Sequence, residues 1–271
     1  MQKTGSFKPR GVLTKLASLS PEEKTRGVIT ASAGNHAIAL AFGAALEGVD
    51  ALVVMYQGAS AFKAAAARAY GAAVDDSAAG AHEVFERLAE LIEETGRVLV
   101  HPFDDQLVLA GQGTVGLEIR EDLPEVEVVV VPTGGGGLVA GIAAALPGVR
   151  VVAVEPEGSA ALRLALEAGE PVRLTPKSIA DGLNAPFAGG NAIAACRERG
   201  VESVLVTEHE IEKGFRFLYE RAKLAAEPAG AAAVAALLAG KVPAVEGATV
   251  VAVVSGGNVS AQTASAILAG R

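Results

Sequence analysis

Short apolar runs alternate with longer amphipathic segments along most of the chain. The short runs predict strands at residues 27–30, 51–55, 97–100, 126–131, 150–155, 204–206 and 249–254. The segments between them predict helices at residues 35–46, 61–70, 82–95, 111–122 and 139–145. Strands that alternate with helices imply parallel pairing with crossover helices. Because the strands are apolar throughout, the predicted fold class is α/β, with sheets covered on both faces.

Composition narrows the class of protein further. The chain has 271 residues, of which 51% are hydrophobic and only 4% aromatic, so alanine, valine and leucine form the core. No stretch reaches the ~20 apolar residues of a membrane helix, and the N-terminus lacks a secretion signal. A net charge of −8 argues against nucleic-acid binding. A single cysteine, Cys196, excludes an intramolecular disulfide framework. We expect a cytoplasmic protein.

Loops that follow the carboxyl ends of parallel strands are where such proteins bind ligands. The loops with unusual sequences are residues 4–10, 32–36, 133–138 and 255–258. The third contains the glycines of the sequence Gly134-Gly135-Gly136-Gly137, between a strand and a helix. Free backbone amides and the positive end of a helix bind anions, so this loop predicts a phosphate site. A loop that was only flexible would lose the conformational entropy of these glycines on folding, with no bound ligand to compensate for the loss.

The phosphate could belong to a dinucleotide. Gly135, Gly137 and Ala140 fit the pattern G-x-G-x-x-A, and Glu155 ends the next strand at the spacing of a ribose-binding acid. This unit alone supports an NAD-binding Rossmann oxidoreductase, which we keep as an alternative. The glycines of residues 111–116 give a weaker match and are interpreted as close helix packing. The NAD alternative leaves the other unusual loops unexplained.

The loop around Lys8 resembles a known family. Residues 3–11, KTGSFKPRG, are similar to the signature of fold-type II pyridoxal-phosphate (PLP) enzymes, and most of all to the serine/threonine dehydratases, a group that includes serine racemase. The resemblance implies that Lys8 carries PLP as a Schiff base, with Phe7 beside it. It extends from residue 2 to about 259, so the implied fold is that of the tryptophan synthase β-like enzymes.

The remaining loops match the same family in chain order. Residues 32–36, SAGNH, are similar to the loop that binds the substrate carboxylate, and Ser32 can also cap the following helix. Ser255 matches the serine that bonds the pyridine nitrogen, and Glu227 matches a glutamate near the active site. The implied substrate-binding residues are Ser32, Ala33, Gly34, Asn35 and His36. The implied cofactor-binding residues are Phe7, Lys8, Asn35, Gly134, Gly135, Gly136, Gly137, Leu138, Gly182 and Ser255.

The resemblance also implies an activity. Lys8, once freed from the cofactor, would remove the Cα proton, and loss of the β-hydroxyl as water would convert L-threonine or L-serine into a 2-oxo acid and ammonia. The neutral hydroxyl of Ser255 does not hold the ring nitrogen protonated, which favours elimination over transamination. Serine racemases carry a serine where this chain has Ala33. We therefore expect a dehydratase with little racemase activity.

Some relatives bind a divalent cation near the phosphate loop. Glu155 matches the first carboxylate of that site and Ser159 its backbone carbonyl, whereas Ala161 stands where the second carboxylate would be. Glu155 could instead cap or pair locally. His82, His101 and His209 lie in no motif and are predicted to be surface or structural residues. Cys196 is predicted to be a small buried hydrophobe.

By resemblance, the larger PLP-binding domain comprises residues 1–26 and 104–271, and the smaller inserted domain comprises residues 27–103. The resemblance implies a small amino-acid substrate, a homodimer, and neither a nucleic-acid nor a membrane partner. It also implies the short catabolic form, without a regulatory domain. Because the lysine motif stands almost at residue 1, we expect a segment of the larger domain to be missing. An inactive, truncated relative is therefore a further alternative.

Overall fold

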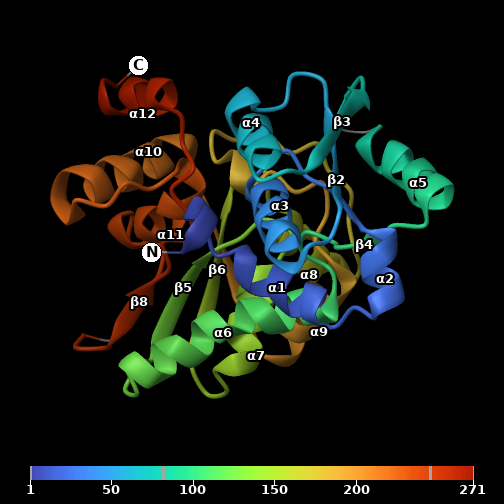
Figure 1. Cartoon of the computed structure of the whole chain (residues 1–271). Coiled ribbons are helices and arrows are strands. Elements are labelled where there is room, and N and C mark those ends of the chain that lie inside the picture. Colours follow the sequence, from blue (N-terminus) through green and yellow to red (C-terminus); the bar gives the residue numbers. More distant parts are fainter. Residues whose placement is uncertain (1, 81–82, 244–245, 271) are drawn as a thin grey trace. The chain divides into compact units, whose positions relative to one another are not determined.

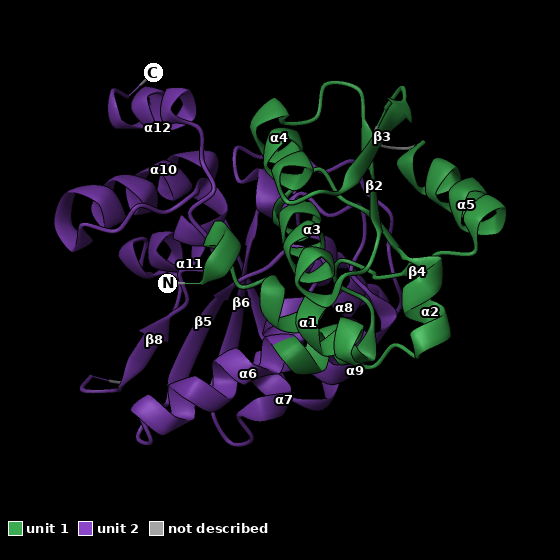
Figure 2. Ribbon diagram, in the orientation of Figure 1, with its two compact units in different colours: residues 1–111 green, residues 112–271 purple. Residues whose placement is uncertain are grey.

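The computed structural model describes residues 2–80, 83–243 and 246–270 (Figure 1). The chain forms two compact units, unit 1 with residues Met1–Gly111 and unit 2 with residues Gln112–Arg271 (Figure 2). Each unit contains its own parallel sheet. The α/β class predicted from the apolar pattern is confirmed.

The sheet of unit 1 has the strand order β3-β2-β1-β4. Its strands are β1 (Val28–Ala31), β2 (Ala51–Tyr56), β3 (Ala73–Ala78) and β4 (Val98–Leu99). The helices of this part of the chain are α1 (Pro9–Ala17), α2 (Pro21–Arg26), α3 (Asn35–Glu47), α4 (Ala61–Ala69), α5 (Val84–Thr95) and α6 (Gln106–Asp122), which continues into unit 2. A 3-10 turn, η1 (Lys3–Gly5), precedes them.

Both faces of this sheet are covered by helices. One core cluster joins α1, α3 and α4 to the strand residues Val28, Val53 and Met55. The other joins α5 to Ile29 and Val54. Neighbouring strand residues thus enter different cores, as the alternation of side chains in a strand requires. This is why the strand sequences are apolar throughout.

The sheet of unit 2 has the order β7-β6-β5-β8. Its strands are β5 (Val128–Pro132), β6 (Arg150–Pro156), β7 (Glu202–Val206) and β8 (Val250–Ala252). Its helices are α7 (Gly137–Ala145), α8 (Ala161–Ala168), α9 (Gly190–Glu198), α10 (Glu208–Phe217), α11 (Pro228–Leu238) and α12 (Ala261–Leu268). A 3-10 turn, η2 (Asp181–Leu183), and a π-helical turn, η3 (Leu218–Ala222), complete it.

The core of unit 2 is built largely from alanine and valine. Helix α11 packs on β5 and β6, where its alanines meet Val130 and Val152. Helices α7 and α8 also contact these strands. Small side chains let helices approach the sheet closely, which explains how a chain with so few aromatic residues forms a well-packed core. No helix of the described residues is long and apolar enough to span a bilayer.

The predicted elements correspond to observed ones, with shifted boundaries. Gly27 does not begin the first strand, because with a φ of +81° it ends α2. The helix predicted at 111–122 begins earlier, at Gln106. The helix predicted at 82–95 is observed from Val84, and residue 82 lies outside the described residues. The division into domains at residues 26/27 and 103/104 stays a prediction.

Candidate active site

Lys8 lies at the N-cap of α1, and its amine is held by the backbone of a distant segment. Its Nζ donates a hydrogen bond of 2.6 Å to the carbonyl oxygen of Pro102. The amine also lies 5.2 Å from the centre of the Phe7 ring. Desolvation lowers the pKa of Lys8 from 10.5 to about 8. A larger fraction of this amine is therefore neutral near physiological pH than of an ordinary lysine.

Residues 32–36 turn the chain from β1 into α3. Ser32 does not cap α3 as predicted, because Gly34 is the N-cap residue and the Ser32 Oγ instead accepts a hydrogen bond from the Gly34 amide at 3.2 Å. Asn35 and His36 begin the helix and are buried. Burial, together with the nearby charge of Lys8, lowers the pKa of His36 well below 6.5. His36 is therefore neutral at physiological pH and lies close enough to Lys8 to feel its charge.

Glycines fix the helix that carries Lys8. A Cβ on Gly43 of α3 would lie 2.8 Å from Val12 of α1. A Cβ on Gly111 of α6 would lie 2.5 Å from the carbonyl oxygen of Arg10. Only glycine permits both approaches. In unit 2, Gly113 has an equally close contact, with the Gly141 carbonyl oxygen of α7. The interpretation of residues 111–116 as close helix packing is confirmed.

The glycine loop of unit 2 joins β5 to α7. Gly136 has a φ of +89° and is the N-cap residue of α7, a conformation that favours glycine. A Cβ on Gly134 would lie 2.9 Å from the carbonyl oxygen of Leu183. The predicted residue Gly182 belongs to the same turn, η2, so the structure brings the glycine loop and this segment together. The loop amides and the helix N-terminus fit a phosphate.

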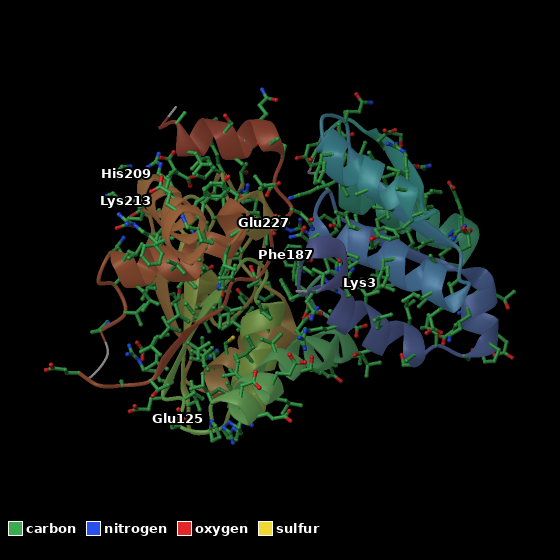
Figure 3. The ribbon with its side chains drawn as sticks, turned by 60° about the vertical axis from the view of Figure 1, so that its left-hand side comes forward. Lys3, Glu125, Phe187, His209, Lys213 and Glu227 are labelled. Carbon is green, nitrogen blue, oxygen red and sulfur yellow. The ribbon has the colours of Figure 1, made fainter. Side chains whose placement is uncertain are left out.

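Ser255 follows β8, the parallel neighbour of β5, so it leaves the sheet at the same edge as the glycine loop. Ser255 is buried, and the adjacent Gly256 accepts a hydrogen bond of 3.0 Å from the amide of Glu227. Glu227 is the buried N-cap residue of α11 (Figure 3). A Cβ on Gly230 would lie 2.4 Å from the Gly256 carbonyl oxygen. The structure thus brings together the predicted residues Ser255 and Glu227.

Glu155 lies at the end of β6 and is fully buried. Its Oε1 accepts from the Leu162 amide at 2.7 Å, and its Oε2 accepts from the Arg163 amide at 2.9 Å and the Ser203 hydroxyl at 2.6 Å. Burial raises the pKa of Glu155 to about 7, while these hydrogen bonds oppose the rise. The carboxylate is occupied at the first turn of α8, and this arrangement disfavours a role on a ribose.

The divalent cation that the family resemblance suggested can be tested on the same residues. Both oxygens of Glu155 already accept hydrogen bonds, from the Leu162 and Arg163 amides at the start of α8. Ala161 supplies no ligand. In the part of the chain that the structure describes, no group of three or more histidine, cysteine, aspartate or glutamate residues is arranged to hold a metal ion. The residues present do not fit a divalent cation.

Sequence reasoning missed the segment of residues 100–104. His101, predicted to be a surface or structural residue, forms hydrogen bonds within it through Nδ1, and Pro102 accepts from Lys8. Only the sequence pair His101-Pro102 directly after a strand marked this segment. His209 is exposed on α10, as predicted (Figure 3). Cys196 is buried as predicted, and burial raises the pKa of its thiol to about 12.

Comparisons with known proteins identify the family of this chain. Residues 1–256 match the family model described as "Pyridoxal-phosphate dependent enzyme". The chain is 45% identical to an L-threonine ammonia-lyase of Thermotoga maritima, covering 96% of this chain and 65% of that protein. It is 41% identical to the catabolic L-threonine dehydratase TdcB of Escherichia coli K12, covering 98% and 83%.

A solved structure shows the same fold. Maize serine racemase superposes with a TM-score of 0.91 at 36% identity, covering 96% of this chain and 82% of that one. The family model matches more than nine tenths of the sequence, from the lysine motif to the first residues of the serine loop. The chain therefore belongs to the family of pyridoxal-phosphate-dependent enzymes, with a fold of type II.

Proposed function

We propose that this chain is a PLP-dependent dehydratase, or ammonia-lyase, that eliminates water from L-threonine, L-serine or both. The products are a 2-oxo acid and ammonia. The observation that carries the proposal is Lys8, whose amine is desolvated, has a pKa of about 8 and is aimed at a backbone carbonyl. The names of relatives at 41% to 45% identity support the same reaction.

Lys8 has two roles in this proposal. It would hold PLP covalently, and as a free neutral amine it would take the proton from Cα of the bound amino acid. When bound, PLP supplies the electron sink that makes this Cα proton acidic. The amides of residues 134–137 would hold its phosphate, and the Ser255 hydroxyl would bond its ring nitrogen without adding a charge. Gly182 lies close to the glycine loop, which supports a role at the cofactor.

Residues 32–36 bind the substrate in this proposal. The amides around Gly34 face the carboxylate, while Asn35 orients the cofactor's phenolic oxygen. His36 is neutral and buried, so it adds no positive charge beside Lys8. Ala33 has no ionisable group. The loop therefore binds and orients, and proton transfer at Cα is left to Lys8.

The experiment is an absorption spectrum of the purified chain supplied with PLP, followed by a keto-acid assay. A lysine-bound cofactor absorbs near ~410–420 nm, and we expect this band to vanish in Lys8→Ala. Lys24→Ala, on the exposed helix α2, is the matched control and should keep the band. A wild-type chain without the band, or one that forms no keto acid from either substrate, would contradict the proposal.

The alternatives give different results in the same experiment. An NAD-binding oxidoreductase would show no band and would bind NAD, an outcome that the occupied carboxylate of Glu155 disfavours. An inactive relative would show the band without keto acid. We further propose that the chain acts as a cytoplasmic homodimer on a small amino-acid substrate, without a nucleic-acid or membrane partner. The single cysteine supports the cytoplasmic compartment, and the net charge of −8 supports the absence of a nucleic-acid partner.

A further inference from the structure

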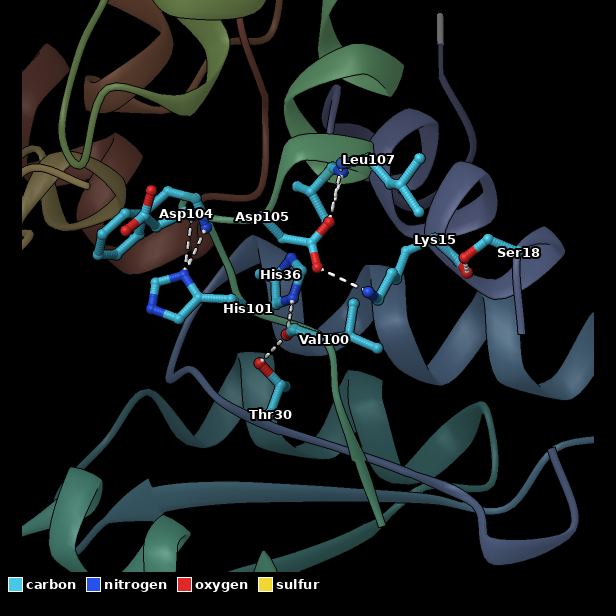
Figure 4. A network of polar contacts seen from close by, with 11 residues as sticks. Lys15, Ser18, Thr30, His36, Val100, His101, Asp104, Asp105 and Leu107 are labelled. Atoms are coloured by element: carbon cyan, nitrogen blue, oxygen red, sulfur yellow. Dashed lines mark hydrogen bonds and ion pairs between the residues drawn. The ribbon is translucent and has the colours of Figure 1, made fainter. Parts of the chain in front are cut away.

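Two buried side chains of unit 1 meet at one backbone carbonyl. The Oγ1 of Thr30 donates to the Val100 carbonyl oxygen at 2.8 Å, and the Nε2 of His36 lies 3.0 Å from the same oxygen (Figure 4). The amide of Val100 also donates to the Ile29 carbonyl oxygen at 2.9 Å. Because a carbonyl only accepts, Nε2 of His36 carries the proton. The backbone of Val100 is therefore held on both sides, through its N–H and through its carbonyl oxygen.

Val100 is the last fixed residue before a turn of residues 101–104. Within this turn, the Nδ1 of His101 accepts from the amides of Phe103 and Asp104, at 3.3 and 2.8 Å. Beyond it, Asp105 pairs with Lys15 of α1 at 2.8 Å (Figure 4). The same carboxylate accepts from the amides at the start of α6. The turn is thus held at both ends and internally.

The carbonyl that holds the Lys8 amine belongs to this turn. The Pro102 oxygen accepts from Lys8 at 2.6 Å, two residues after the fixed Val100 peptide. A proline restricts the backbone of its own residue and of the residue before it. Little freedom therefore remains between the Val100 carbonyl and the Pro102 carbonyl. A displacement of Val100 would be transmitted to the acceptor of the Lys8 amine.

Packing alone does not explain the Thr30 hydroxyl or the His36 imidazole. Thr30 is completely buried in a strand whose other residues are apolar, and valine has nearly the same shape. A buried hydroxyl or imidazole is costly unless it forms a hydrogen bond. The titratable groups that act electrostatically on His36 are Lys8 and His101, whereas its hydrogen bond is to the Val100 carbonyl. The shared contact of Thr30 and His36 is the Val100 carbonyl.

We propose that Thr30 and His36 are positioning residues for Lys8, acting through the Val100 carbonyl and the turn that presents the Pro102 carbonyl. The inference rests on the proposed function in one respect, that Lys8 is the lysine that holds the cofactor. When Lys8 is a free, neutral amine, an N–H directed at Pro102 fixes the direction of its lone pair. That lone pair both attaches the cofactor and takes the Cα proton.

The test removes one donor without changing the shape of its side chain. Thr30→Val deletes the hydroxyl, and Thr30→Ser retains it. Thr95→Val is the matched control, because the Thr95 hydroxyl also donates to a backbone carbonyl, that of Leu91 at the end of α5. Each full-length protein is freed of cofactor and mixed with PLP. The rate of attachment is read near ~410–420 nm, and borohydride reduction with peptide mass spectrometry locates the product on Lys8.

We expect Thr30→Val to attach PLP ~10-fold more slowly and to lose a similar factor in kcat, with little change in KM. Thr30→Ser should recover most of the attachment rate, and Thr95→Val should match the wild type. Because Thr30 and His36 act on the same oxygen, adding His36→Gln to Thr30→Val should have less than the multiplied effect.

The inference is wrong if Thr30→Val attaches PLP at the wild-type rate. It is equally wrong if Thr95→Val is slowed as much, because the effect would then be a general loss of stability. If Thr30→Val does not fold, Thr30→Ser and His36→Gln give the same comparison with smaller changes. A wild-type chain that attaches PLP to Lys8 and forms keto acid while the variants behave normally sinks this inference alone. Failure of the wild type to attach PLP sinks the proposed function as well.

Discussion

At the scale of the single residue, the chemistry of this chain depends on the environment of Lys8. The amine is desolvated, and among the described residues it donates to a backbone carbonyl rather than to a carboxylate. An anion beside it would favour the charged form, whereas a carbonyl stabilises it less. The site therefore keeps the pKa of Lys8 closer to physiological pH than the pKa of an ordinary lysine.

This environment predicts how Lys8 reacts as pH changes. Because burial lowers its pKa to about 8, the neutral amine should appear as pH rises through about 8, and the reaction with acetic anhydride should be half-maximal there. The measurement is competitive labelling of the cofactor-free protein between pH 6 and 11, read by peptide mass spectrometry. A free lysine derivative in the same solution provides the ordinary profile. Labelling of Lys8 that follows this derivative would contradict the assignment.

Ala33 makes a prediction about the stereochemistry of the reaction. The residue lies in the turn before α3, two positions before Asn35, and its methyl group can neither give nor take a proton. Starting from L-serine, we expect far less D-serine than pyruvate. Ala33→Ser should increase D-serine formation, whereas Ala33→Gly, which also lacks a hydroxyl, should not. Chiral chromatography of both products checks this, and racemisation comparable with pyruvate formation in the wild type would refute it.

The residues of the candidate site differ in how far the sequence could reveal them. Lys8, Ser255 and the glycine loop stand in contiguous motifs, so their identity could be read without coordinates. Thr30 and Pro102 could not, because each meets a distant residue at a backbone carbonyl. Thr30 donates to the Val100 carbonyl, 70 positions away. The Pro102 carbonyl accepts from Lys8, 94 positions away. A carbonyl acceptor leaves no mark on the sequence, since every residue has one.

At the scale of the helix, α1 lies close to α6 because α6 has a glycine, which lacks a side chain, at the point of contact. The Arg10 carbonyl, the Gly11 backbone and Thr14 all approach Gly111 of α6 within 2.6 Å of where a Cβ would lie. Most of these atoms belong to the backbone, which cannot rotate away as a side chain can. We therefore treat α1 and the first turns of α6 as one rigid element.

Gly111→Ala tests this packing. We expect the substitution to lower the free energy of unfolding by ~1–3 kcal/mol, because the helices must separate to admit a methyl group. Urea unfolding followed by circular dichroism gives the number. Gly190→Ala at the start of α9 is the control, since no atom from another described part of the chain lies within 4 Å of its added Cβ. Equal stability of both variants would show that α6 shifts without cost.

The start of helix α8 depends on hydrogen bonds to the Glu155 carboxylate. Its carboxylate links the end of β6 to the first turn of α8 and to Ser203 of β7. Glu155→Ala should lower the free energy of unfolding by about 3 kcal/mol, because buried amides lose their acceptor. Glu157→Ala, on the exposed turn that follows, should change it little.

The absence of a metal at Glu155 has its own test. Dialysis against EDTA should alter neither the unfolding temperature nor keto-acid formation. If Mg²⁺ stabilised the wild type but not Glu155→Ala, a metal at Glu155 would be reinstated.

Some elements could not be predicted from periodicity. Helix α11 is alanine-rich and buried on nearly all sides, so no polar face marks its period. Strand β3 has the opposite problem, since Asp75 and Asp76 stand in a strand at the edge of the sheet. The buried central strands were found because both of their faces are covered. The hydrophobic pattern of an element reflects which of its faces are exposed to water. Helix α11 is buried on nearly all sides and β3 is partly exposed, so neither has the usual pattern.

At the scale of the whole molecule, the surface carries apolar side chains that the core does not cover. Many large apolar side chains, such as Phe215, are buried, but several others are exposed. At the end of α10 and in the turn that follows, Phe217, Tyr219 and Leu224 are 40%, 51% and 39% exposed. Exposed apolar side chains that are close in the chain are typical of an interface. We expect them to contact a second copy of the chain, as proposed above.

Light scattering coupled to gel filtration tests this interface. The wild type should elute with twice its mass of 27.2 kDa. Tyr219→Asp should shift the protein to the mass of one chain, because a carboxylate would be desolvated in the interface. Leu46→Asp is the control, since Leu46 is 63% exposed on α3 and lies outside the proposed interface. If Tyr219→Asp keeps the doubled mass, the dimer forms elsewhere. If the wild type has the mass of one chain, the exposed side chains need another explanation.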